Sequence, residues 1–371
     1  MAQTELPKRQ AARAGRKKTK KKKKFGWFRL IYRTVISLLI LAIIGVCWLF
    51  FTNSGESFRY LAADTLITTQ HRKWAKYIIG EDELKKRVAE YNEKFEQMGT
   101  EKDTHTISIP APVENQQKPL VEIEPISGNS YKGYIMTVND PTKIRLGVPD
   151  TVGKGEKVSS MVNRLGAIAG VNAGGFDDPN WKGNGFKPIG VVISQGKLYY
   201  NGLGSSTSTQ IVGIDKQGKM IAGHYSLSEL SEMNVQEAVT FQPRIIVNGK
   251  GQINSHKDGW GIAPRTAMGQ RADGAILFVV IDGRQPGYSI GADLYDVQNI
   301  MLEHGAVIAA NLDGGSSTVL VKYGGIVNKP SSQYGERYLP TAFLVFDDPE
   351  NVTVPNIWQG LDPKEIDGGK K

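Results

Sequence analysis

The sequence predicts an α+β protein: a strand-rich, mixed-sheet domain with a few helices, preceded by a transmembrane helix and a helical stalk. Three observations lead to this fold class. An uncharged apolar segment lies near the N-terminus, a charged stretch with helically spaced apolar residues follows, and from about residue 120 short apolar runs alternate with glycine-bearing turns. We divide the 371 residues accordingly into a basic cytoplasmic tail at 1–29, a transmembrane anchor at 30–51, a stalk at 52–100, a linker at 101–119, a folded domain at 120–347 and a C-terminal tail at 348–371.

The anchor is the most strongly apolar part of the chain. From Thr34 to Phe51 no side chain is charged, and this length is close to the roughly 20 residues that a bilayer core requires. A cleaved signal peptide is the alternative, but its apolar core is shorter and ends in small residues, which Phe50-Phe51-Thr52-Asn53 does not provide. We therefore expect an uncleaved, single-pass anchor.

The net charge of +9 is concentrated at the N-terminus. Residues 1–33 hold 13 of the 46 Lys and Arg and one of the 37 acidic residues, which leaves this segment at +12 and the rest of the chain at −3. Because excess Lys and Arg stay on the cytoplasmic side, the N-terminus is predicted to be cytoplasmic and the C-terminal body extracellular. Since that body is not basic, we exclude nucleic acid as a partner.

The single cysteine, Cys47, falls inside the predicted membrane span, so the exported part contains no disulfide. Exported domains of this size without disulfides are common in bacteria and less so among secreted eukaryotic proteins. We therefore expect a bacterial cell-membrane protein.

Residues 57–98 predict two amphipathic helices that Gly80 separates, with Glu81-Asp82-Glu83 well placed at a helix N-terminus. Their apolar faces either pack on the domain, which we favour, or form dimer contacts, so the oligomeric state stays open. The polar, proline-bearing segment 101–119 indicates a linker. We expect residues from about Glu101 onward to fold as a soluble unit.

Strand signals dominate the domain, and two helical patterns interrupt them. The strands are predicted at 121–124, 134–138, 144–148, 167–171, 275–281, 306–310, 318–321 and 341–346, and the helices at 157–165 and 293–304.

The stretch that best fits a site is the polar turn at 311–317, which directly follows the apolar strand 306–310. A turn with two adjacent glycines holds its neighbouring side chains in a fixed pose at the edge of a core. Asp313 would be partly desolvated there, and Ser316 and Ser317 add hydroxyls beside free backbone amides, which suits a phosphate oxygen. The alternative is an Asp-Gly turn that merely joins two strands.

A similar glycine turn, 172–178, follows the strand at 167–171. Asn172 offers a hydrogen-bond donor and an acceptor, and Asp177 and Asp178 are candidate acids or metal ligands. A solvated turn is the alternative, and for Asp178 we favour it.

Three further polar residues repeat this placement near strand ends. Arg265 at a strand start would give a bidentate contact to phosphate or carboxylate, and Asp282 directly follows the run 275–281. Arg337 lies in a loop ahead of the last strand, where a surface ion pair is the alternative. His224, His256 and His304 lack the spacing of a zinc site.

Taken together and in this order, five motifs resemble the phosphodiester glycosidase family. They are Asn172-Ala173-Gly174-Gly175-Phe176, Arg265-Thr266-Ala267-Met268-Gly269, Asp282-Gly283-Arg284, Asn311-Leu312-Asp313-Gly314-Gly315-Ser316-Ser317 and Gly335-Glu336-Arg337. The resemblance covers roughly Ile123 to Asp347. The chain departs from the family at Gly175, where the family often has Phe, and at Ser316, where it often has a third glycine.

The resemblance implies hydrolysis of a sugar-1-phosphate diester at the anomeric carbon, which leaves a phosphomonoester on the other partner. It implies catalytic carboxylates at Asp313 and Asp282, and substrate-binding roles for Asn172, Arg265, Ser316, Ser317 and Arg337. No cofactor is required. A divalent cation would fit if Asp282 and Asp313 converge, but no ligand spacing demands one.

We expect the substrate to be a phosphate-linked glycopolymer of the cell envelope, such as an exopolysaccharide. Two alternatives stay open. The domain would bind such a polymer without cleaving it, or it would act as a transferase that uses the same diester as donor.

Overall fold

The computed structural model describes residues 24–69, 71–108, 118–179 and 183–369, and the predicted α+β class is confirmed. The chain forms two compact units, one ending at Phe58 and one running from Arg59 to the C-terminus. Each unit is considered by itself.

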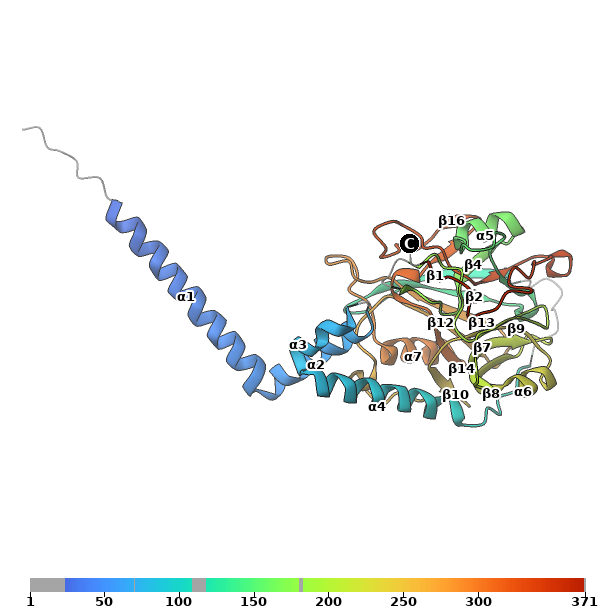
Figure 1. Cartoon of the computed structure of the whole chain (residues 1–371), viewed down its shortest axis with the longest axis horizontal. Coiled ribbons are helices and arrows are strands. Elements are labelled where there is room, and N and C mark those ends of the chain that lie inside the picture. The colour runs from blue at the N-terminus through green and yellow to red at the C-terminus, as the bar shows by residue number, and fades with distance from the viewer. Residues whose placement is uncertain (1–23, 70, 109–117, 180–182, 370–371) are drawn as a thin grey trace, which may run out of the picture. The chain divides into compact units, whose positions relative to one another are not determined.

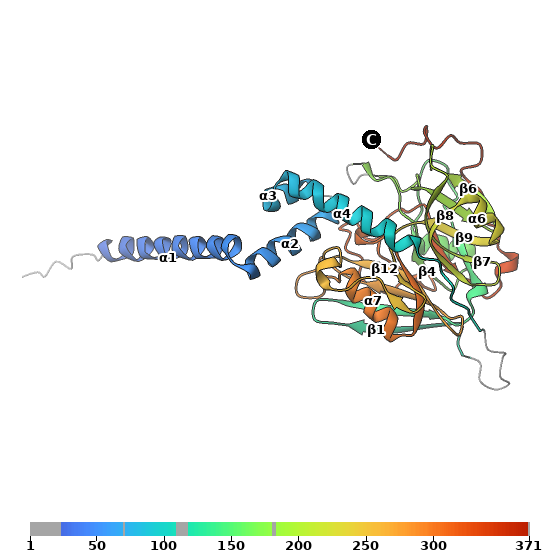
Figure 2. The ribbon, with the colours of Figure 1, turned by 90° about the horizontal axis from the view of Figure 1, so that it is seen from below.

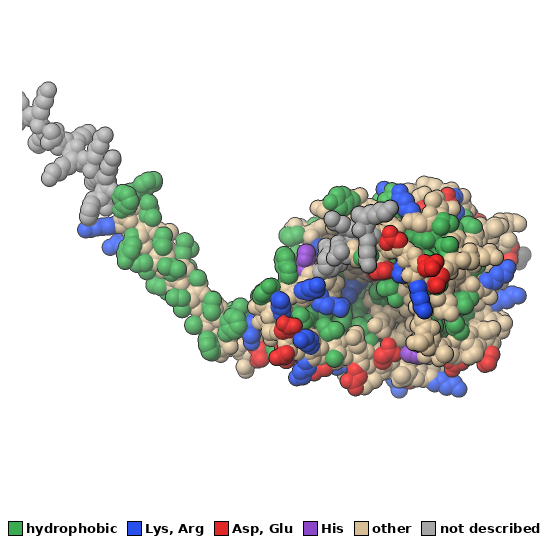
Figure 3. Space-filling model, in the orientation of Figure 1, with side chains coloured by type: hydrophobic (Ala, Val, Ile, Leu, Met, Phe, Trp, Pro, Cys, Tyr) green, Lys and Arg blue, Asp and Glu red, His purple; other side chains and the backbone are tan. Residues whose placement is uncertain are grey.

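The first unit contains the long helix α1, Lys24–Phe51 (Figure 1). Its segment Gly26–Phe51 is long and apolar enough to cross a membrane, although a signal sequence passes the same test of length and composition. Hydrophobic side chains cover the visible surface of this helix (Figure 3). On the face of the second unit shown there, acidic and basic side chains are interspersed, so that face carries no broad basic patch.

The remaining helices are α2 Asn53–Ile67, α3 Lys76–Ile79, α4 Glu81–Thr100, α5 Val158–Leu165, α6 Leu227–Glu232 and α7 Leu294–Glu303. The strands are β1 Val121–Ser127, β2 Lys132–Val138, β3 Ile144–Gly147, β4 Ala169–Asn172, β5 Val191–Ser194, β6 Lys197–Asn201, β7 Ser208–Asp215, β8 Met220–Ser226, β9 Val235–Thr240, β10 Arg244–Val247, β11 Lys250–Gly251, β12 Arg265–Arg271, β13 Ile276–Ile281, β14 Ala306–Leu312, β15 Leu320–Lys322, β16 Gly325–Ile326 and β17 Ala342–Val345.

The strands form three sheets whose paired strands run antiparallel. The largest has the order β1-β2-β13-β12-β14-β10-β11, the second β16-β15-β4-β17-β3 and the third β6-β5-β9-β7-β8. The strands predicted at 275–281 and 306–310 are the central β13 and β14, and the helix predicted at 293–304 is α7.

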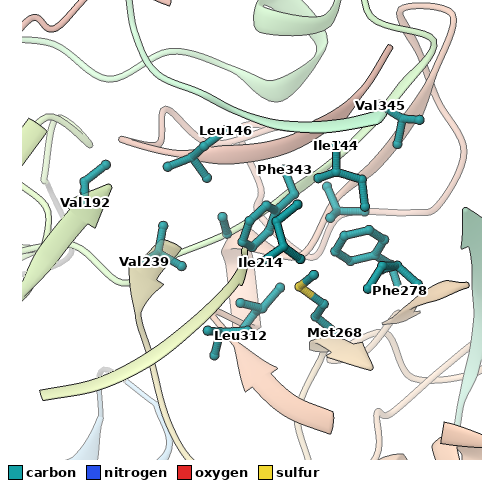
Figure 4. Packing of buried hydrophobic residues seen from close by; sticks show 14 of the residues in the cluster. Ile144, Leu146, Val192, Ile214, Val239, Met268, Phe278, Leu312, Phe343 and Val345 are labelled. Carbon is teal, nitrogen blue, oxygen red and sulfur yellow. The ribbon is translucent and has the colours of Figure 1, made fainter. Parts of the chain in front are cut away.

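One core lies where the inner faces of the three sheets meet (Figure 4). Because side chains alternate along a strand, each sheet sends every second residue inward. Met268 and Leu312 come from the first sheet, Phe343 from the second and Val239 from the third. The outer faces are covered by α7 on the first sheet, α5 on the second and α6 on the third.

Helix α4 belongs to the body of the domain. It lies against β8 and β10, and its Phe95 is buried in the cluster that α7 forms with the first sheet (Figures 1 and 2). The buried Arg244 donates to the carbonyl oxygens of Met98 at 3.0 Å and Glu101 at 2.7 Å, at the end of this helix. The apolar face that we expected to pack on the domain does so. A chain beginning at Glu101 would lose the contacts of α4, and its independent folding stays a prediction.

The segment expected to be a C-terminal tail also packs on the domain. Trp358 is buried among Phe186 and Tyr200, and its ring nitrogen donates to the carbonyl oxygen of Phe186 at 3.0 Å. Tyr199 donates to the carbonyl oxygen of Val354 at 2.7 Å. Residues beyond 348 therefore contribute to the core and to the surface near it.

Candidate active site

The register of the first sheet brings three of the predicted residues to one edge. β12 pairs antiparallel with both β13 and β14. Arg265 opens β12 opposite Ile281, and the next residue of β12 lies opposite Leu312. Because Asp282 and Asp313 directly follow β13 and β14, both acidic residues lie at the edge where Arg265 begins its strand.

The turn after β14 is more constrained than a simple hairpin. The Gly314 amide donates to Oδ1 of Asp313 at 3.0 Å, and the Gly315 amide donates to the carbonyl oxygen of Pro264 at 2.9 Å. Gly315 has φ of +62° and opens a short 3₁₀ turn that ends at Ser317. Glycine adopts this left-handed conformation without the steric cost of a side chain, so the turn is held in one shape.

Asn172, at the end of β4, joins the turn to the second sheet. Its Nδ2 donates to the carbonyl oxygen of Asp313, and its Oδ1 accepts from Thr266 Oγ1 at 2.8 Å and from the Val319 amide at 3.1 Å. The Asp313 amide in turn donates to the carbonyl oxygen of Ala173 at 3.0 Å. The Asn172 side chain is fully buried and used within the protein, so it positions the Asp313 backbone.

Arg337 reaches the turn from the loop ahead of β17. Its Nη1 donates to Asp178 Oδ2 at 2.7 Å and to Ser316 Oγ at 3.3 Å, and its guanidinium lies 5.0 Å from the centre of the Phe176 ring. The neighbouring Glu336 is buried and accepts from the amide and hydroxyl of Ser159 at the start of α5. Glu336 therefore fixes the loop, and the loop presents Arg337 to the turn.

Arg284 is a site residue that our sequence reasoning did not assign, although it belongs to one of the matching motifs. A Cβ on Gly315 would lie 3.1 Å from Nη2 and 3.5 Å from Cζ of Arg284, so its guanidinium rests directly on that glycine. Partial burial lowers the pKa of Arg284, and the nearby Asp313 carboxylate opposes the shift. Gly315 was the only hint in the sequence: a side chain there would meet the Arg284 guanidinium, but this contact is visible only in the structure.

Asp313 carries the most perturbed environment at this edge. Its Oδ2 is inaccessible to solvent and has no hydrogen-bond partner among the described residues. Burial raises its pKa to about 6, while Ser317, Arg337 and the Gly314 amide act in the opposite direction, and the charge of Asp178 adds to the rise. A carboxyl group with this pKa exchanges a proton near neutral pH, which an ordinary aspartate does not.

Arg265 is buried at the start of β12, and most of its guanidinium nitrogens donate to backbone carbonyl oxygens. Nε donates to the carbonyl oxygen of Ala292 at 3.1 Å, and Nη2 donates to those of Trp260 and Gly261 at 2.9 and 2.7 Å. In the described part of the chain Nη1 has no such bond. Burial lowers the pKa of Arg265 to about 10, with Asp293 opposing the shift and the nearby Arg284 adding to it. The two guanidinium groups are thus close enough to repel.

Asp282 is buried and its carboxylate is fully engaged. Oδ1 accepts from Asn328 Nδ2 and from the Lys329 amide, both at 2.9 Å, and Oδ2 accepts from the Tyr288 hydroxyl at 3.0 Å. Burial raises its pKa, and these donors oppose the shift. The carboxylate ties the loop at 328–329 to the end of β13, which is a supporting role.

A cleft of about 790 Å³ begins beside the Arg337–Asp178 pair. Phe176 and Asp178 form one wall, Lys187, Ile189 and Tyr200 line it further away, and Asp362, Pro363 and Lys364 close it from the C-terminal segment. Phe176 and Asp178, which contact Arg337, line this cleft, and its volume suits a group of drug-like size. We favoured a solvated turn for Asp178, but its carboxylate pairs with Arg337.

The predicted residues fall into two groups. Asp313, Ser316 and Ser317 form one turn that Arg337 contacts. Asn172 uses its side chain to hold this turn, whereas Arg265 holds the loop at 260–261 and Asp282 holds the loop at 328–329. Of the residues that the structure describes, His256, Asp293 and Asp296 could together hold a metal ion. Asp293 caps α7 and accepts from both His256 and the Asp296 amide, so helix capping explains this trio.

Comparisons with known proteins agree with the sequence motifs. The family model for phosphodiester glycosidases matches residues 165–346. Over 216 residues the chain is 27% identical to the SPbeta prophage-derived uncharacterized protein YomE of Bacillus subtilis strain 168, which covers 56% of this chain. The chain spans about a third of that relative's length, at 32%.

Among solved structures, the catalytic domain of zebrafish N-acetylglucosamine-1-phosphodiester alpha-N-acetylglucosaminidase, auto-inhibited by its pro-peptide, is similar with a TM-score of 0.52. The identity is 21%, over 67% of this chain and 88% of that one, so this match supports the fold. A hypothetical protein from Synechocystis matches with a TM-score of 0.44 and 17% identity, over 61% of each chain.

Proposed function

Because residues 165–346 form a domain of the phosphodiester glycosidase family, we propose that this chain hydrolyses sugar-1-phosphodiester bonds at the turn Asp313–Ser317. One observation carries the proposal: the guanidinium groups of Arg284 and Arg337 both lie at a turn whose buried carboxyl group has its pKa raised to about 6. Cations for a phosphate and a carboxylate for the sugar are the parts that this reaction needs.

The phosphate would bind among Arg337, Arg284 and Ser316. Arg284 lies on Gly315 and Arg337 donates to Ser316, so both guanidinium groups face the same turn. Arg265 adds a third positive charge beside Arg284. Like charges that face one turn are stabilised by a shared anion, and a phosphodiester supplies one.

Asp313 would serve as the general base. In the hydrolysis, the bond between the anomeric carbon and the phosphate oxygen breaks, and its electron pair leaves with the phosphate. A water oxygen bonds to the anomeric carbon, and its proton passes to the Asp313 carboxylate. A pKa of about 6 keeps that carboxylate ionised at neutral pH and still able to accept a proton. Because the phosphomonoester is a good leaving group, no strong acid is required opposite the base.

The other side of the diester would extend into the cleft beyond Arg337. The cleft adjoins the guanidinium through Phe176 and Asp178, and its remote wall comes from the C-terminal segment. This arrangement suits a phosphate attached to a larger alcohol, as in a glycopolymer of the cell envelope, rather than to a small free alcohol.

The membrane attachment is a proposal of its own. We infer that α1 is an uncleaved anchor, because its apolar stretch has membrane length and the 13 Lys and Arg of residues 1–33 favour a cytoplasmic N-terminus. The domain would then face the outside. In a Cys47→Ser background, a cysteine at the exposed position Glu365 should react with an impermeant thiol reagent on intact cells, and labelling only after lysis would reverse this topology.

The activity is tested by incubating the full chain, in detergent, with sugar-1-phosphodiesters of varied sugar and alcohol. We expect free reducing sugar and phosphomonoester in equal amounts. Adding an acceptor alcohol distinguishes a transferase, which would form a glycoside of that alcohol instead of free sugar. Tight binding of such diesters without release of either product would identify a binding protein and contradict the proposal.

A further inference from the structure

The loop at 256–262, between β11 and β12, lies between the helices that precede the family domain and the arginine that opens β12. Trp260 lies within this loop and has φ of +62°, a conformation that residues other than glycine rarely adopt. Its ring meets Tyr91 of α4 edge-on, with centroids 4.1 Å apart, and lies 4.6 Å from Phe95. A costly backbone conformation persists where its surroundings impose it, and here α4 does so.

The same loop is held by α2 on its other side. The Ile262 amide donates to Thr65 Oγ1 at 3.1 Å. Gly261 is so close to α2 that a Cβ there would lie 2.5 Å from the Thr65 nitrogen. Two successive residues of the loop therefore contact one helix, and Trp260 contacts the other.

The two helices are themselves fastened together next to this contact. Arg87 of α4 makes two hydrogen bonds to the buried Asp64 of α2, at 2.8 and 2.5 Å. Lys94 of α4 pairs with Asp258 of the loop at 2.8 Å. Bidentate contacts of this kind fix geometry as well as adding energy, so α2, α4 and the loop form one rigid assembly.

The inner side of that assembly holds Arg265. Nη2 of Arg265 donates to the carbonyl oxygens of Trp260 and Gly261, the two residues that the helices clamp. Arg265 is also the neighbour of Arg284, whose guanidinium rests on the Gly315 turn beside Asp313. A continuous set of contacts therefore runs from α2 and α4 through the loop to Arg265, and the carbonyl oxygen of the adjacent Pro264 accepts from the Gly315 amide of the turn at 2.9 Å.

We propose that Trp260 is a positioning residue and that α2 and α4, which precede the family domain, set the geometry of the active site through it. The inference rests on the proposed function, because the position of Arg265 bears on activity only if the site takes a phosphate. Loss of the clamp would let the carbonyl oxygens of Trp260 and Gly261 move and the Arg265 guanidinium turn with them. Displacement by about 1 Å at a reacting site is enough to reduce turnover roughly a hundredfold.

The test uses the full chain in detergent and two readouts, inorganic phosphate as a competitive inhibitor and kcat/KM on a sugar-1-phosphodiester. For Trp260→Ala we expect both phosphate affinity and kcat/KM to fall about tenfold or more. The acid limb of the pH profile, which reports Asp313, should stay in place. Trp260→Phe keeps a ring between Tyr91 and Phe95 and should restore most of both quantities.

Trp74→Ala is the matched control, because Trp74 is an exposed tryptophan of the same helical region and does not touch the loop. It should behave as the wild type. If Trp260→Ala does not fold, Thr65→Val gives the same test, since it removes the bond to the Ile262 amide at nearly constant volume. Wild-type phosphate affinity and turnover in these variants would overturn the inference alone. A wild-type chain that neither binds phosphate nor releases sugar would overturn the proposed function and the inference with it.

Discussion

Two strands of the large sheet, β13 and β14, lie on either side of β12; they end in the same way and produce opposite environments. Each runs through the core and is followed directly by an aspartate and a glycine. At Asp282 both carboxylate oxygens are occupied by three donors, whereas at Asp313 one oxygen is buried without a partner. The end of the strand therefore determines where the carboxylate lies. The surrounding loops determine whether its oxygens are all hydrogen-bonded within the protein or one is left to react.

The largest effect should come from removing the charge of Asp313. Asn has nearly the same shape but cannot take a proton from water, so we expect Asp313→Asn to lower kcat roughly 10²–10⁴-fold. The folded pKa of about 6 exceeds the ordinary value of 3.8, so the buried carboxylate costs stability as pH rises through that window, by up to about 3 kcal/mol. The thermal midpoint at pH 7 should therefore be unchanged or higher in the variant. Near-normal turnover would make Asp313 a turn residue only.

A smaller effect is expected at Arg337, which contacts the turn after β14 through Ser316. Arg337→Lys keeps the charge but loses the planar guanidinium, whose Nη1 donates to both Ser316 and Asp178. We expect kcat/KM to fall roughly ten- to a hundredfold, or about 1–3 kcal/mol, with the thermal midpoint little changed. Arg271→Lys is the control, because Arg271 also pairs with an aspartate, Asp273, and has no contact with the site residues. A collapse of the thermal midpoint in the Arg337 variant alone would identify a structural ion pair.

The smallest effect should follow the conservative change at the other strand end. In Asp282→Asn the side-chain oxygen can still accept from Asn328 and Lys329, and the new amide can donate to Tyr288. We expect turnover to stay within about tenfold of the wild type, because the charge of Asp282 is not used in the reaction. Asp282→Ala, which leaves three donors without a partner, should lower the free energy of unfolding by about 1–3 kcal/mol. Loss of activity in the Asn variant as severe as in Asp313→Asn would place both carboxylates in catalysis.

The sequence predicted the strands and the position of Asp313 correctly because both follow from short-range patterns. Apolar runs mark β13 and β14, and antiparallel register alone then places their ends together. The division of roles between Asp282 and Asp313 could not be predicted in this way, because it depends on Asn328, Lys329 and Tyr288, which come from other loops.

The same limit applies to the arginines. From the sequence, an arginine at a strand start is equally able to bind a phosphate or backbone carbonyl oxygens. In the structure, the loop at 256–262 provides carbonyl oxygens that accept from Arg265. Arg284 was passed over because its guanidinium lies over a glycine 31 positions away. The helices at 53–100 were recognised from their period, but their contact with this loop joins parts of the chain more than 150 residues apart.

The central claim, that Asp313 acts through its ionised form and Asp282 does not, is tested most directly by the pH dependence of kcat/KM between pH 4 and 8. For the wild type we predict that activity rises with pH along an acid limb whose apparent pKa is about 6, the value that burial gives Asp313. Asp282→Asn should show the same limb at the same pH. A limb near pH 4 in the wild type, or one that moves when Asp282 is replaced, would contradict the account.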